Sequence, residues 1–330
     1  MANRTGGAST AYFQWPPRIR YTGAMDVSNG KQGAPATLGA ALQYCNDALA
    51  AAGLHFGHGT DNAWDEAVQL VLHALRLPAH SDDTVLSLPL DGAGWQRVQA
   101  LLRRRIEERV PLPYLLGRAW FAGLELRCDA RAIVPRSPIG ELIVNEFQPW
   151  YGGPAPARVL DLCCGGGAIG LATAHYHPQA RVDLVDLDDD ALALARENAQ
   201  LLGVSGRVEI QQSDLFSALG GRRYDLVLCN PPYVNAGDLA AMPAEFYAEP
   251  ELSLGSGEDG LDLTRRILAA AGDHLEPHGL LILEVGHSWP ALELAYPRVP
   301  FTWIEFEHGG AGVFAMSAGE WQEYSASWRR

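Results

Sequence analysis

The sequence predicts an α/β fold in which a parallel sheet, covered by helices on both faces, follows a small bundle of helices. From residue 157 onward, short apolar runs of strand length alternate with segments of helical periodicity, the order expected for strands joined by crossover helices. Before that point, residues 37–116 contain three segments of helical periodicity separated by loops with glycine or proline. A chain of 330 residues, 48% of them hydrophobic, is long enough to build both units.

The N-terminal part divides into a tail and a helical bundle. Residues 1–36 are rich in small residues and proline and lack periodicity, so we expect a mostly disordered tail. Helices are expected from Thr37, which suits an N-cap, at 64–75 and at 95–108. The arginine run at 103–105 is interpreted as a solvated helix face rather than a recognition patch.

Residues 117–138 change character and are predicted to form a β-hairpin linker. The first part of this segment alternates in the manner of strands around Gly123. Pro135-Arg-Ser-Pro138 closes the linker, and its second proline suits the first turn of a helix that continues to residue 147. The α/β domain is therefore expected to span residues 139–330.

The α/β domain is predicted to contain five parallel strands and a terminal hairpin. The strands are expected at residues 158–163, 182–186, 207–210, 224–229 and 279–285. Helices are expected at residues 168–175, 190–202 and 261–275. The segment at residues 301–316 suits a final hairpin.

Charge and cysteine content narrow the class of protein. A formal net charge of −14 disfavours general attraction to nucleic acid and favours a basic protein partner. The five cysteines include no CxxC pair, and no histidine cluster has metal-ligand spacing, so we expect a reduced, cytoplasmic protein without a metal site. No apolar run resembles a secretory signal or approaches about 20 residues, so no membrane association is expected.

A glycine-rich turn is the first motif that points to a ligand. Asp161-Leu-Cys-Cys-Gly-Gly-Gly-Ala-Ile-Gly170 follows a buried-type strand and opens a helix. Gly165 and Gly167 let the backbone turn tightly and approach a ligand, and the helix N-terminus adds amide donors. Taken alone the turn leaves two alternatives open, a glycine turn without a ligand and an NAD site.

Two acidic positions follow at the ends of later strands. Asp186 lies 25 residues after Asp161, where its carboxylate can accept both ribose hydroxyls of an adenosyl ligand. The alternative is a surface acid in an acid-rich stretch, and we assign the acids at 188–190 to the helix N-terminus. Asp214, followed by Leu215, ends the third strand, where it either accepts from an adenine amino group or caps a helix.

The motif Asn230-Pro-Pro-Tyr233 is the strongest evidence for a catalytic site, because it directly follows the fourth strand. Pro231 and Pro232 fix a rigid turn without amide donors, which leaves a carbonyl free to accept a hydrogen bond. The Asn230 side-chain oxygen is a second acceptor, and Tyr233 offers a flat face to a planar amide or base. An NH2 group held by both acceptors directs its lone pair toward a methyl donor. We therefore interpret this turn as catalytic rather than as an ordinary loop.

Together the motifs resemble the methyltransferases that modify exocyclic or amide nitrogens. That class uses an Asn- or Asp-Pro-Pro-aromatic turn and includes DNA adenine-N6, DNA cytosine-N4 and protein-glutamine enzymes. Here the glycine loop precedes the catalytic turn and no large target-recognition insert is present, which is similar to the protein-glutamine branch. One departure is Cys163, where most of the superfamily has the first loop glycine, so Gly165 and Gly167 are the better candidates for close backbone contact.

Finer resemblance lies in the linker. Segments 119–123 and 134–143 resemble the linker of the enzymes that methylate a glutamine of ribosomal large-subunit protein three. The sister release-factor enzymes usually carry a Pro-Arg-Pro-Asp-Thr segment there. Segments 249–252 and 257–262 are also similar to this family, and the resemblance covers about residues 37–316.

The resemblance implies a fold, a reaction and a site. The fold is a Rossmann-like class I methyltransferase domain with a seven-stranded, mostly parallel sheet, preceded by a helical bundle that recognises the substrate. The reaction moves a methyl group from S-adenosylmethionine to the side-chain amide nitrogen (N5) of a glutamine in ribosomal large-subunit protein three. The alternatives are methylation of release factors, DNA adenine-N6 methylation, and a cofactor-binding protein that has lost catalysis.

The implied site has two parts and no metal. The catalytic residues are Asn230, Pro231, Pro232 and Tyr233. The cofactor-binding residues are Asp161, Gly165, Gly167, Asp186, Asp214, Leu215 and Asn230. The partner is the protein substrate, and stable nucleic-acid binding is not expected.

Overall fold

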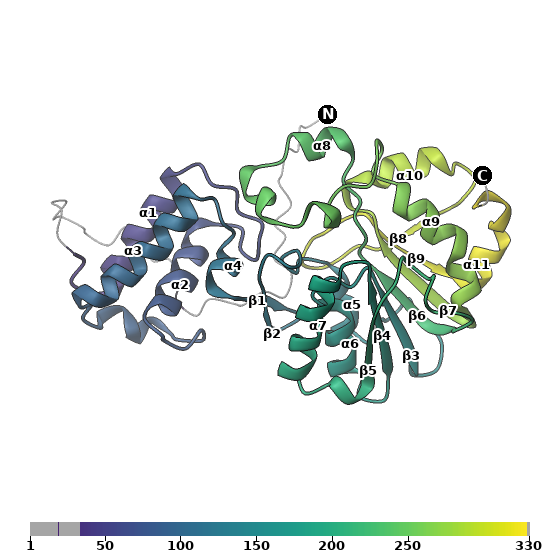
Figure 1. Ribbon diagram of the computed structural model, residues 1–330, viewed down its shortest axis with the longest axis horizontal. Helices are drawn as coiled ribbons and strands as arrows, with labels where there is room; N and C mark the ends of the chain where they lie inside the picture. The colour runs from purple at the N-terminus through teal and green to yellow at the C-terminus, as the bar shows by residue number, and fades with distance from the viewer. Residues whose placement is uncertain (1–18, 20–33, 329–330) are drawn as a thin grey trace.

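The computed structural model describes Ile19 and residues 34–328, which form a helical unit and an α/β unit (Figure 1). The disorder expected for residues 1–36 falls mostly outside the described part of the chain. Ile19 lies within that segment but is fully buried in the helical core. Its carbonyl oxygen accepts a hydrogen bond of 3.2 Å from the Trp64 indole.

The helical unit contains α1 (Leu38–Ala51), α2 (Ala63–Ala74), α3 (Gly92–Glu107) and α4 (Leu112–Leu116). Side-chain caps fix where the first two helices begin. Thr37 Oγ1 accepts a hydrogen bond of 3.3 Å from the Ala40 amide, and Asn62 Oδ1 accepts one of 2.9 Å from the Asp65 amide. The apolar sides of these helices then pack into one buried cluster.

The prediction that the arginines at 103–105 form a solvated helix face is wrong for one of the three. Arg105 is fully buried, and its guanidinium donates to Glu66 at 2.8 and 3.1 Å. The neighbouring Arg104 is exposed, as expected. Arg105 shares the buried face of α3 with Val98 and Leu102, so helical periodicity places it inward, whereas Arg104 points outward. What the sequence does not show is the pair of carboxylates from other elements that makes a buried guanidinium stable.

The linker is a two-stranded antiparallel sheet formed by β1 (Arg118–Phe121) and β2 (Leu124–Arg127). The helix after it, α5 (Ile139–Val144), is shorter than the sequence predicts. Glu146 and Phe147 adopt φ angles of +55° and +59°. A right-handed helix cannot continue through that left-handed conformation, so the predicted end at residue 147 is wrong.

The α/β unit is built on one seven-stranded sheet with the order β5-β4-β3-β6-β7-β9-β8. The strands are β3 (Arg158–Leu162), β4 (Arg181–Asp186), β5 (Val208–Gln212), β6 (Tyr224–Cys229), β7 (Leu275–Glu284), β8 (Thr302–Trp303) and β9 (Val313–Ser317). The first five are parallel, and β9 pairs antiparallel with both β7 and β8. This confirms the predicted fold class, the terminal hairpin and the seven strands that the resemblance implies.

Helices cover both faces of the sheet (Figure 1). One buried cluster joins α5, α6 (Ala168–Tyr176) and α7 (Asp189–Leu201) to one face. A second joins α9 (Asp262–Ala270), α10 (Trp289–Ala295) and α11 (Ala318–Glu323) to the other. None of the described helices combines the length and apolarity that crossing a membrane requires.

The expected helix at 261–275 is wrong at its C-terminal end. The α-helix stops at Ala270, residues 271–274 form a 3₁₀ turn, and β7 begins at Leu275 rather than at residue 279. The segment that follows β6 contains a short helix, α8 (Ala236–Ala240), and two 3₁₀ turns, Ala244–Ala248 and Glu251–Ser253. In Figure 1 this segment, drawn in green, lies between the helical unit and the sheet.

Candidate active site

The glycine-rich turn after β3 adopts the left-handed backbone that its glycines permit. Cys163, Gly165 and Gly167 have φ angles of +60°, +53° and +85°. A Cβ on Gly167 would lie 2.9 Å from a Leu171 methyl carbon, so this glycine also lets α6 pack closely. Cys163 adopts the same left-handed conformation although it has a side chain, which is unusual for a residue other than glycine.

Asp186 is tied to the glycine-rich turn. Its Oδ2 accepts a hydrogen bond of 2.8 Å from the Gly165 amide, and its Oδ1 accepts one of 3.0 Å from the Asp188 amide. Burial raises the pKa of Asp186, while these backbone donors lower it. Each carboxylate oxygen keeps a second lone pair, so both can still accept from a diol.

Asp161 lies beneath the turn rather than in the cavity. It is fully buried, and its Oδ2 accepts a hydrogen bond of 2.7 Å from the Gly170 amide at the start of α6. Burial raises the pKa of this carboxyl to about 8. Neither Asp161 nor Gly167 lines the cavity in front of the turn. Asp161 and Gly167 therefore stabilise the conformation of the turn, whereas Gly165 lines the cavity.

A narrow cavity lies along the carboxyl ends of β3, β4, β5 and β6. Of the predicted cofactor-binding residues it is lined by Gly165, Asp186, Asp214, Leu215 and Asn230. Several other residues line this cavity that the sequence motifs do not predict, namely Ile133, Leu187, Ser213, Leu252, Ser253, Leu263 and Arg266. Leu187 and Ser213 adjoin the motif residues Asp186 and Asp214 in sequence. The other five come from distant loops or from α9, so no local motif could identify them.

Asp214 has a partner that neither alternative from the sequence anticipates. Both of its carboxylate oxygens accept hydrogen bonds of 2.8 Å from Arg266 on α9. This exposed ion pair lies at the wall of the cavity. Leu215 follows with a φ of +50°, which turns the chain sharply.

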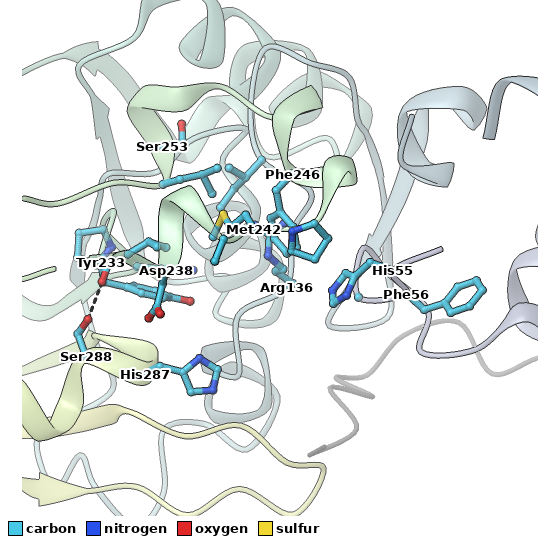
Figure 2. Close-up of a pocket in the computed structure, with 18 of the residues that line it drawn as sticks. His55, Phe56, Arg136, Tyr233, Asp238, Met242, Phe246, Ser253, His287 and Ser288 are labelled. Atoms are coloured by element: carbon cyan, nitrogen blue, oxygen red, sulfur yellow. Dashed lines mark hydrogen bonds between the residues drawn. The ribbon is translucent and has the colours of Figure 1, made fainter. Parts of the chain in front are cut away.

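Asn230 stands where two cavities meet. It lines the narrow cavity together with Pro232, and it lines a larger cavity of about 830 Å³ together with Pro231 and Tyr233. Figure 2 shows side chains from both units of the chain around the larger cavity. A group held in the larger cavity can therefore meet a group held in the narrow one at this turn.

Three contacts fix Tyr233. Its hydroxyl donates to Glu284 Oε1 at 3.0 Å, and its carbonyl accepts a hydrogen bond of 2.7 Å from Ser288 Oγ (Figure 2). A Cβ on Gly286 would lie 2.4 Å from the Tyr233 ring, so only glycine leaves room for the ring there. Burial raises the pKa of Glu284 to about 7, although hydrogen bonds from Ser137 and Tyr233 lower it.

A half-buried Arg136 and a buried Glu249 form an ion pair beside the turn. The guanidinium donates to Glu249 Oε2 at 2.6 Å, and Arg136 also lines the larger cavity. Burial alone would raise the pKa of Glu249, but Arg136 holds it at about 2. Both residues fall in segments whose family resemblance the sequence reveals, yet only the structure brings them together. Glu284 carries no such signal beyond being a polar residue at the end of an apolar strand.

The fold and the site define the class of protein as a methyltransferase. Residues 141–257 match the family model described as "Methyltransferase small domain". This segment includes the glycine-rich turn, Asp186 and the Asn230–Tyr233 turn. A methyltransferase from Pyrococcus furiosus of known structure is 19% identical, with 59% of this chain and 89% of that chain covered and a TM-score of 0.41. The class assignment depends on the sheet order and the family model rather than on that likeness.

Two relatives narrow the class to one family. A ribosomal protein uL3 glutamine methyltransferase from Xanthomonas campestris pv. campestris is 50% identical over 285 residues, which cover 86% of this chain and 92% of the relative. A protein of the same name from Xylella fastidiosa is 49% identical over 279 residues, which cover 84% and 89%. The chain belongs to the family of ribosomal protein uL3 glutamine methyltransferases. This confirms the branch that the linker and the catalytic turn predict.

Proposed function

We propose that this protein transfers a methyl group from S-adenosylmethionine to the side-chain amide nitrogen of a glutamine in ribosomal protein uL3. The observation that carries the proposal is the position of Asn230 at the junction of the two cavities. Family membership supports the choice of substrate, since the relatives carry that activity in their names. Such a substrate would be met in the cytoplasm, where ribosomal proteins are made.

The residues of the narrow cavity fit an adenosyl cofactor. Gly165 presents backbone without a side chain, and Asp186 offers two carboxylate oxygens to a ribose diol. Leu215 and Leu187 supply apolar surface suited to a flat base. When bound, S-adenosylmethionine supplies a methyl group made electrophilic by its sulfonium.

Asn230 and Pro231 orient the amide that accepts the methyl group. The Asn230 side-chain oxygen and the Pro231 carbonyl accept the two hydrogens of the glutamine NH2, which directs its nitrogen toward the narrow cavity. Both acceptors also stabilise the positive charge that develops on that nitrogen, as donors stabilise an oxyanion in other enzymes. The proton leaves after methyl transfer, so no strong base is required at the nitrogen.

Tyr233 supplies the surface on which the planar amide lies. Glu284 holds the ring through its hydroxyl, and Ser288 holds the backbone of the turn through the Tyr233 carbonyl. Glu284 itself does not line the larger cavity, so it positions Tyr233 and has no contact with the amide. A fixed ring restricts the amide to near-attack orientations, which is where positioning contributes most to rate.

A labelling experiment tests the proposal. The purified protein and S-adenosylmethionine carrying a labelled methyl group are incubated in parallel with uL3, a peptide-release factor and duplex DNA. We expect label on uL3 alone, at one glutamine located by mass spectrometry. Label on the release factor would move the protein to the sister activity, label on DNA would replace the substrate class, and label on none would contradict methyl transfer.

A further inference from the structure

Two of the segments that line the larger cavity belong to different units and are far apart in sequence. The loop between α1 and α2 contributes His55, Phe56 and Asp61, and the segment after the Asn230–Tyr233 turn contributes Asp238 and Phe246. In Figure 2, His55 and Phe56 approach from the helical unit, while Asp238 lies near Tyr233. The helical unit is therefore a part of the cavity and not a separate appendage.

A buried carboxylate holds the two walls together. Glu245, next to Phe246, accepts hydrogen bonds from the His55 amide at 3.1 Å and from the guanidinium groups of Arg105 and Arg109, each at 3.3 Å. It is almost fully buried. Ion pairs between buried groups fix geometry because neither partner can turn to solvent. Glu245 therefore ties the loop between α1 and α2 to the segment after the Asn230–Tyr233 turn.

The charges that line the cavity disfavour a nucleic acid. Among the described residues that line it, Arg136 is the only arginine or lysine, and its guanidinium is already engaged by Glu249. A phosphate backbone requires several cations along its path. Two carboxylates, Asp61 and Asp238, line the cavity instead. Asp238 is exposed, and its carboxylate accepts a hydrogen bond of 2.7 Å from the Asn235 side-chain amide, which is an uncharged donor.

We propose that this cavity binds a loop of the protein substrate and that Asp238, assisted by Asp61, recognises a basic residue beside the target glutamine. The inference depends on the proposed function and specifies how its substrate is chosen. Phe56 and Phe246 supply apolar surface for the loop, and the carboxylates supply charge complementary to lysine or arginine. The helical unit thereby takes part in substrate choice through the wall that Asp61 belongs to.

Steady-state kinetics of charge-neutral variants tests the inference. In Asp238→Asn we expect KM for uL3 to rise about five-fold, the effect of one exposed ion pair, with kcat and the affinity for S-adenosylmethionine unchanged. Because Asp238 lies in the short helix α8, its replacement can also disturb that helix. Asp61→Asn, on the opposite wall, provides an independent measurement. The dependence of kcat/KM on salt should become shallower in both variants. Asp273→Asn, an exposed acid outside the cavity, should behave as wild type.

Substitutions in the substrate sharpen the result. Once the modified glutamine is located, each neighbouring lysine or arginine of uL3 is replaced by alanine. Replacing the residue that Asp238 recognises should lower kcat/KM about five-fold when the wild-type enzyme acts on uL3. The same replacement should change kcat/KM little when Asp238→Asn is the enzyme. If Asp238→Asn and Asp61→Asn methylate uL3 with the KM and salt dependence of the wild type, the inference is overturned. The proposed methylation of uL3 is then unaffected. Absence of uL3 methylation by the wild type would instead remove the function, and the inference with it.

Discussion

The hydroxyl of Tyr233 donates a hydrogen bond of 3.0 Å to the buried carboxylate of Glu284. The other oxygen of that carboxylate accepts one of 2.6 Å from Ser137 Oγ. The Asn230–Tyr233 turn, the end of strand β7 and the linker therefore meet on a single side chain. This arrangement explains how a short turn at the edge of the sheet can hold one orientation without secondary structure of its own.

Replacing Asn230 should reduce turnover far more than cofactor binding. In Asn230→Ala one of the two amide acceptors is lost, and we expect kcat to fall by roughly two to three powers of ten, by analogy with the loss of one preorganised oxyanion donor. Single-turnover methylation of uL3 measures the rate, and calorimetry measures cofactor affinity. Equal turnover in variant and wild type would refute the assigned role.

Replacing Asp186 should have the opposite profile. Asp186→Ala removes the carboxylate that Gly165 positions, and the loss of two charge-assisted hydrogen bonds, each contributing about 1.5 kcal/mol or more, should weaken S-adenosylmethionine binding at least about a hundredfold. Asp189→Ala is the matched control, because Asp189 is an acid at the start of α7 that does not line the cavity. An unchanged dissociation constant in Asp186→Ala, measured by calorimetry, would exclude this role.

Adding one methyl group at Gly286 should disturb catalysis through Tyr233. A Cβ there would lie 2.4 Å from the ring, so the ring must move, and we expect turnover to fall at least about tenfold. Gly220→Ala is the control, because Gly220 also has positive φ but no atom lies within 4 Å of the added carbon. Both variants should lose about 1–2 kcal/mol of stability from backbone strain. Similar turnover in the two would argue against steric control of the ring.

Glu284 should make stability depend on pH. The pKa of Glu284 rises from 4.5 to about 7 on folding, so the stability that its proton contributes is present below about 4.5 and is lost as pH rises through 7. Relative to wild type, Glu284→Gln should gain roughly 2–3 kcal/mol of unfolding free energy between about pH 5 and pH 8. Urea denaturation at both pH values measures the difference. The exposed Glu258→Gln serves as control, and a pH-independent difference for Glu284→Gln would count against the buried proton.

Adjacent arginines on α3 should differ sharply in their effect on stability. Arg105→Ala leaves Glu66 and Glu245 buried without the guanidinium between them, and we expect a loss of about 3–5 kcal/mol. Arg104→Ala removes only an exposed pair with Glu108 and should cost less than about 0.5 kcal/mol. Chemical denaturation compares the two, and equal losses would contradict the buried network.

Local patterns in the sequence determine the fold class and the position of the site. Alternating strand and helix periods specify the parallel sheet, because each period reflects which face of an element is buried. The order of motifs then places Gly165, Asp186 and Asn230 after the first, second and fourth strands of the sheet, whose carboxyl ends all lie at one edge. Element boundaries are less well determined, since positive φ at Glu146 and Phe147 depends on packing rather than on composition.

Only the tertiary structure decides which distant side chains support the site. Arg105 has its partner Glu245 140 residues later in the chain, where no local pattern can show it. Ser137 and Glu284, 147 residues apart, meet for the same reason. A local pattern reports burial and backbone preference along one element, whereas a buried charge is stable only through partners that folding brings from other elements. The sequence therefore locates the turn that we propose to be catalytic, and the fold supplies the groups that hold it.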